Sequence, residues 1–66
     1  MKFEAVTRRV LAEFNEMPGL TLTPRQASRL FGLDPDLCQR VLDALIDMAY
    51  LREAGGTVRR GDRFAA

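Results

Sequence analysis

Hydrophobic residues recur at helical spacing through the first quarter of the chain. They follow one another at intervals of three, four, four and three residues, so they share one face of a helix. These residues are Phe3, Val6, Val10, Phe14 and Met17. Pro18 and Gly19 then end the pattern, because proline cannot continue a helix and glycine favours a turn. The pattern predicts an amphipathic helix over about residues 2–17.

A second helix is marked by its start signal rather than by its length. Thr23 is a suitable N-cap, Pro24 stands at the first helical position, and Gln26 lies three residues past the cap. Gly32 follows after about two turns, where a residue that tolerates positive φ commonly ends a helix. We expect this helix over about residues 24–31.

The third helix begins in the same way, with Asp34 as N-cap and Pro35 at the first helical position. The longest apolar face of the chain follows at intervals of mostly three or four residues. It comprises Cys38, Val41, Leu42, Leu45, Ile46 and Ala49. This spacing predicts a central core helix over about residues 35–49.

Beyond this helix, two short stretches flank Ala54-Gly55-Gly56, which is typical of a β-hairpin over about residues 50–60. The tail, residues 61–66, has no clear pattern, and we expect it to be frayed. The predicted fold class is mostly α with a small β-hairpin, in a single domain formed by all 66 residues.

Composition removes several function classes. The chain has one cysteine, Cys38, and no histidine, so neither an internal disulfide nor a Cys/His metal site can form. It has no nucleophile–base pair and no glycine-rich phosphate loop, and the sequence therefore predicts no enzyme, cofactor or metal. Cys38 faces the predicted core and is interpreted as a small buried hydrophobic residue. The charged start of the chain resembles no signal peptide, so we expect a soluble cytoplasmic protein without membrane segments.

Charge is distributed unevenly although the net charge is only +1. Residues 34–47 carry four Asp and one Arg, a balance of −3, whereas residues 52–66 carry four Arg, one Glu and one Asp, a balance of +2. Nine of the ten basic residues are arginines, whose forked guanidinium suits phosphates and carboxylates.

The stretch from Leu22 to Pro35 resembles the helix-turn-helix of bacterial winged-helix transcription regulators. It has a Leu-Thr entry, the small residue Ser28 inside the second helix, and Gly32 at the turn. Buried positions of the third helix and an exit into the wing follow, with Ala49 in place of the usual glycine. The resemblance covers about residues 22–60. It implies a winged helix-turn-helix fold in which residues 20–22 pair with the hairpin as a third short strand.

The resemblance further implies that the third helix enters the major groove of duplex DNA through its N-terminal half. Gln39 and Arg40 would then read bases or contact a phosphate. Arg25 and Arg29 on the second helix would contact the backbone, and Arg59 and Arg60 on the wing would contact a flanking phosphate or the minor groove. For each arginine, an ordinary solvated charge is the alternative; for Arg40, it is an ion pair with Asp36 or Asp43.

The acidic third helix argues in the other direction. Asp34, Asp36 and Asp43 would repel phosphates, although Asp34 is most simply a helix cap. Leu37 is expected to be exposed, and with Ala44 and Met48 it forms a second apolar stripe. This stripe is either covered by the first helix or the wing, or it is a surface for self-association or a protein partner. A protein-interaction module therefore remains the alternative to DNA binding, and RNA is not distinguished from DNA.

Overall fold

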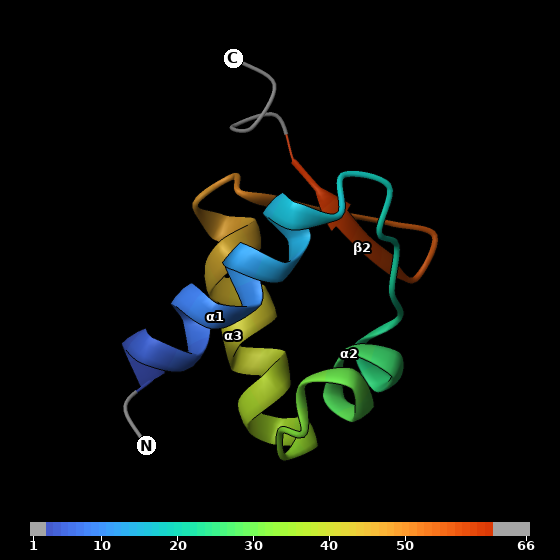
Figure 1. The fold of residues 1–66 in the computed structure, drawn as a ribbon. Helices are drawn as coiled ribbons and strands as arrows, with labels where there is room; N and C mark the ends of the chain where they lie inside the picture. The colour runs from blue at the N-terminus through green and yellow to red at the C-terminus, as the bar shows by residue number, and fades with distance from the viewer. Residues whose placement is uncertain (1–2, 62–66) are drawn as a thin grey trace.

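A computed structural model of the chain describes residues 3–61. Its elements are α1 (Phe3–Glu16), α2 (Pro24–Phe31), α3 (Pro35–Asp47), β1 (Leu51–Ala54) and β2 (Thr57–Arg60). α1 and α3 lie side by side, α2 lies at the N-terminal end of α3, and the hairpin lies near the opposite end (Figure 1). The fold is thus three helices and a two-stranded antiparallel hairpin, as the hydrophobic pattern predicts.

The core is formed by side chains of all three helices together with Leu22 and residues of the hairpin. Val6, Val10 and Phe14 are buried along α1, whereas the two ends of the predicted apolar face, Phe3 and Met17, are each 43% exposed. Phe14 contacts Phe31 of α2 with ring centroids 6.3 Å apart, in a tilted arrangement that aromatic pairs favour. The central part of the α1 stripe therefore supplies the core contacts.

α2 has the predicted capping box. The Gln26 backbone N–H donates to Thr23 Oγ1 at 3.1 Å, and the Thr23 N–H donates to Gln26 Oε1 at 2.9 Å. These bonds satisfy two backbone N–H donors at the helix start. Pro24, at the first helical position, has no N–H and therefore leaves no donor unsatisfied there. Such a cap contributes about 1 kcal/mol, which matters for a helix of only 8 residues.

The turn from α2 to α3 is closed by Gly32 in the left-handed conformation, with φ 65°. The Leu33 N–H donates to the Ser28 carbonyl at 3.0 Å and the Gly32 N–H to the Arg29 carbonyl at 3.4 Å, which is the Schellman pattern. Ser28 does more than provide a small side chain, because its hydroxyl donates to the Leu33 carbonyl at 2.7 Å. The turn is therefore held by both backbone and side-chain bonds.

The prediction that α3 continues to residue 49 is wrong, because the helix ends at Asp47. Here the Tyr50 N–H donates to the Leu45 carbonyl at 2.9 Å and the Ala49 N–H to the Ile46 carbonyl at 3.0 Å. This is a second Schellman closure, and Ala49 occupies its left-handed position with φ 66°. The helix stops because these bonds turn the chain toward the buried Leu51.

The hairpin turns at Gly55 and Gly56, whose φ values of 59° and 81° fit a two-residue turn of the type that antiparallel hairpins prefer. Leu22 pairs with Val58 of β2 through two backbone hydrogen bonds: the Leu22 N–H donates to the Val58 carbonyl at 3.0 Å, and the Leu22 carbonyl accepts from the Val58 N–H at 2.6 Å. The connector between α1 and α2 is thereby fixed to the hairpin, but the third strand that the resemblance implies for residues 20–22 is reduced to this one residue pair, and the sheet has two strands.

The prediction of a frayed tail from residue 61 onward is wrong for Gly61. Its N–H donates to the Tyr50 carbonyl at 2.8 Å, which extends the hairpin by one bond. A Cβ at Gly61 would lie 2.7 Å from the Ala49 carbonyl oxygen and 3.0 Å from the Leu51 carbonyl carbon. The close backbone approach therefore requires glycine here. Residues 62–66 of the predicted tail lie outside the described residues.

Candidate nucleic-acid interface

α2 and the start of α3 form a groove of about 420 Å³ between them. Its lining consists of Pro24, Arg25, Ser28, Arg29, Pro35 and Gln39. Two arginines, four residues apart on α2, therefore line the same hollow as Gln39 of α3, and no Asp or Glu is part of the lining. Within residues 3–61, neither Arg25 nor Arg29 forms an ion pair. The fold thus brings three of the predicted DNA-contacting residues together.

Gln39 and Arg40 differ from the α2 arginines because each is bound to a carboxylate of its own helix. The Gln39 amide donates to Asp43 Oδ1 at 2.9 Å, and the Arg40 guanidinium lies 3.4 Å from Asp36 Oδ2. The pair of Arg40 and Asp36 was predicted as the alternative to a DNA contact. Both side chains of that pair are 70–80% exposed, so solvent screens the attraction and the pair is worth little.

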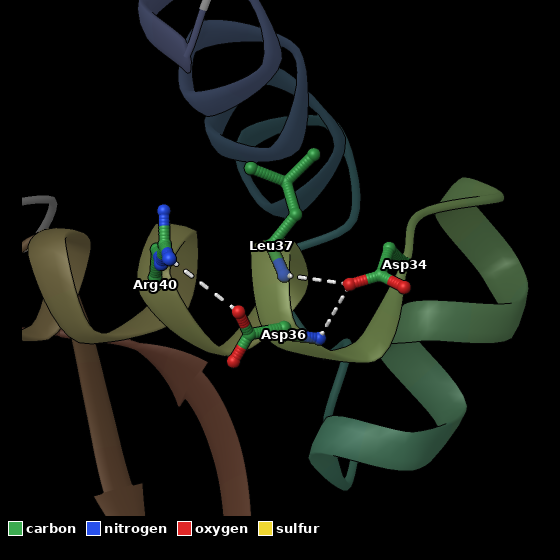
Figure 2. Close-up of polar contacts among 4 residues, drawn as sticks. All are labelled: Asp34, Asp36, Leu37 and Arg40. Carbon is green, nitrogen blue, oxygen red and sulfur yellow. Dashed lines mark hydrogen bonds and ion pairs between the residues drawn. The ribbon is translucent and has the colours of Figure 1, made fainter.

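Asp34 is the N-cap of α3, as its sequence position indicates. One carboxylate oxygen accepts from the Asp36 N–H at 3.0 Å and from the Leu37 N–H at 3.4 Å (Figure 2). The Asp34 charge is directed at the helix N-terminus, where it favours the helix dipole. One of the three carboxylates that seemed unfavourable for DNA therefore has a structural purpose.

The register of the hairpin corrects the grouping of Arg59 with Arg60. Leu51 pairs with Arg60 and Arg52 with Arg59, and directly paired residues lie on the same face of a two-stranded sheet. Leu51 is buried, so Arg60 lies on the face toward the core, where it is half-buried and already has an interaction partner. Arg59 lies on the outward face with Arg52 directly opposite. Counting residues outward from the Gly-Gly turn is the sequence signal that identifies Arg52 as the residue opposite Arg59.

The predicted apolar stripe of Leu37, Ala44 and Met48 is only partly covered by α1. Leu37 was expected to be exposed, but its side chain is half-buried against the core and is directed toward α1 (Figure 2). Ala44 is half-buried as well, and Met48 alone is 44% exposed. Ala44 and Met48 line a second groove of about 460 Å³ together with residues of α1, and Leu37 is not part of that lining.

Cys38 is 1% exposed, which confirms its interpretation as a core residue. Its thiol lies 3.9 Å from the Pro24 carbonyl oxygen, where α3 packs against the start of α2. Burial raises the pKa of the Cys38 thiol above its ordinary value. The reactive thiolate is therefore disfavoured at neutral pH.

Within residues 3–61, no group of three or more His, Cys, Asp or Glu side chains is placed to hold a metal ion. In the same part of the chain, no helix is both long and apolar enough to cross a bilayer. No protein-family profile, no curated protein and no solved structure matches this sequence. Function must therefore be inferred from the residues and geometry of this chain.

Proposed function

We propose that this chain is a winged helix-turn-helix domain that binds duplex DNA, as a transcription regulator or accessory protein. The observation that carries the proposal is the groove between α2 and α3, which has Arg25 and Arg29 in its lining and no carboxylate. The element order, the paired Leu22 and Val58, and the Gly32 turn between two capped helices support the winged-helix assignment.

In this proposal the arginines of α2 carry the affinity by contacting the phosphate backbone. Their guanidinium groups have no carboxylate partner within residues 3–61, so a phosphate does not have to displace an existing ion pair. Gln39 reads an adenine edge through its side-chain amide. Arg40 exchanges Asp36 for a base or a phosphate.

The outward face of the hairpin provides a second contact. Arg52 and Arg59 lie directly opposite each other, and like charges at such positions destabilise a hairpin in isolation. Neither forms an ion pair within residues 3–61. A phosphate between the two guanidinium groups relieves their repulsion, so this face is suited to the flanking backbone of the duplex.

The test is the salt dependence of binding to a fluorescent random-sequence duplex, measured by anisotropy. Each phosphate contact contributes about 0.9 to the slope of log affinity against log salt. We expect Arg25→Ala and Arg29→Ala each to flatten the slope by about one and to weaken binding at all salt concentrations. Arg9→Ala is the control, because Arg9 is an exposed arginine of α1 outside both proposed contacts. Undetectable binding at low salt, or equal effects of all three substitutions, would reject the proposal.

A protein-interaction module is the second candidate, favoured by one observation. Both side chains that were predicted to read bases are held by carboxylates of α3, which leaves that helix face acidic at Asp36, Asp43 and Asp47. On this hypothesis the domain binds no nucleic acid, and α3 contacts a basic protein surface. This hypothesis is favoured if the domain binds no DNA and if a protein partner recovered with the wild-type chain is lost when Asp36→Asn and Asp43→Asn are combined.

A further inference from the structure

The side-chain amide of Gln39 is held in one orientation by Asp43. Its nitrogen Nε2 donates to Asp43 Oδ1 at 2.9 Å across one turn of α3. An ionised carboxylate only accepts hydrogen bonds, so the reversed amide would place two acceptors, Gln39 Oε1 and Asp43 Oδ1, against each other. Asp43 therefore determines which end of the amide points toward it.

The remaining hydrogen-bonding capacity of the amide is open to a ligand. Nε2 has a second N–H, and Gln39 Oε1 accepts no hydrogen bond within residues 3–61. Gln39 lines the groove between α2 and α3 with Arg25 and Arg29, whereas Asp43 is not part of that lining. The carboxylate thus holds the amide from outside the groove, and one donor and one acceptor remain for a group that binds there.

The number of donors distinguishes the two purines. In the major groove adenine presents one acceptor, N7, and one donor, the N6 amino group, whereas guanine presents two acceptors, N7 and O6. One N–H and one carbonyl satisfy adenine, but guanine requires both N–H groups of the amide, and Asp43 occupies one of them. We infer that Asp43 is a positioning residue that makes Gln39 select adenine over guanine. The inference rests on the proposed DNA binding and adds to it the residue that enforces a base preference.

The test compares base preference rather than affinity. A duplex library with a randomised centre is incubated with the protein, and the bound fraction is sequenced. The position that loses its preference for adenine on Gln39→Ala is the one that Gln39 reads, and the wild type should show an adenine-to-guanine ratio of at least about five there. Asp43→Ala should lower this ratio about twofold, which corresponds to the strength of an exposed hydrogen bond between side chains four residues apart on a helix. Asp43→Glu retains an acceptor-only group and should keep the ratio of the wild type.

Asp36→Ala is the matched control, because it removes the same charge from α3 but its carboxylate contacts Arg40 and not Gln39. It should tighten binding to every duplex and leave the ratio at the Gln39 position unchanged. When Gln39→Ala is already present, Asp43→Ala should no longer alter the base preference at that position. Asp36 and Asp43 are exposed and alanine favours a helix, so circular dichroism should find these variants folded.

The possible failures separate this inference from the proposed DNA binding. An unchanged ratio in Asp43→Ala, or an equal loss in Asp36→Ala, would overturn the inference while DNA binding stands. So would a library in which Gln39→Ala changes the base preference at no position. If no duplex is retained at low salt, the proposed DNA binding is rejected and the inference with it.

Discussion

Ala49 provides a direct test of how α3 ends. It occupies the left-handed position of the Schellman closure with φ 66°, a conformation that costs a non-glycine residue about 1–2 kcal/mol. Ala49→Gly removes this cost but gives the unfolded chain more freedom, which is worth about 0.5–1 kcal/mol in the opposite direction. We therefore expect a net stabilisation of about 0.5–1 kcal/mol.

For a chain of 66 residues, that gain corresponds to a rise in Tm of roughly 4–7 °C, since unfolding entropy is about 2.1 cal/mol/K per residue. Thermal unfolding followed by circular dichroism at 222 nm, a standard helix signal, gives the measurement, with urea midpoints as a second estimate. The gain should come from the backbone alone, because the substitution adds no contact and deletes only a methyl group from an exposed residue.

Two control substitutions make the test selective. Gly32→Ala places alanine in the same left-handed position at the end of α2, where its Cβ would meet nothing within 4 Å, so it should lose as much stability as Ala49→Gly gains. Ala12→Gly, at an exposed position inside α1, should lose about 1 kcal/mol. If Ala49→Gly lowers Tm as Ala12→Gly does, Ala49 is not left-handed and the account of the helix end is wrong.

Three further outcomes are expected. Gly61→Ala should destabilise the protein by more than about 1 kcal/mol in urea unfolding, because its Cβ would lie 2.7 Å from the Ala49 carbonyl oxygen; an unchanged midpoint would contradict this contact. Asp36→Asn with Asp43→Asn should tighten duplex binding in the anisotropy assay by removing phosphate repulsion, and weaker binding would count against α3 as a DNA contact. Burial raises the pKa of the Cys38 thiol because the folded state favours its neutral form. The resulting contribution to stability should be fully present below the unfolded thiol's pKa of about 8.5, and it should be lost as pH rises through the higher folded pKa. Cys38→Ala should therefore flatten the alkaline decline in urea-unfolding stability, and an unaltered decline would refute the assignment.

Local signals in the sequence were sufficient for the starts of α2 and α3. The side chains of Thr23, Gln26 and Asp34 form their capping hydrogen bonds with residues two or three places away, so their spacing determines the caps almost without tertiary context. The turn at Gly32 is equally local, because its closure involves backbone groups of the same helix. The buried middle of α1 followed from periodicity for the same reason.

Features that depend on packing between elements were not predictable in this way. Leu37 points outward on an isolated helix, but the position of α1 across α3 covers it. Arg59 and Arg60 are adjacent in sequence yet lie on opposite hairpin faces, and the packing of the hairpin decides which of the two faces the core. Gly61 is constrained by the backbone of residues 49–51, a contact that no local pattern contains.

The most direct test of the proposed DNA binding is a titration of the ¹⁵N-labelled protein with a short duplex, followed by amide chemical shifts. The account predicts the largest shifts at the residues around the α2–α3 groove, Arg25, Arg29 and Gln39, with a second group at Arg52 and Arg59. Amides of the groove between α1 and α3, such as Leu11 and Met48, should shift little. Shifts confined to that second groove, or none at low salt, would contradict the account.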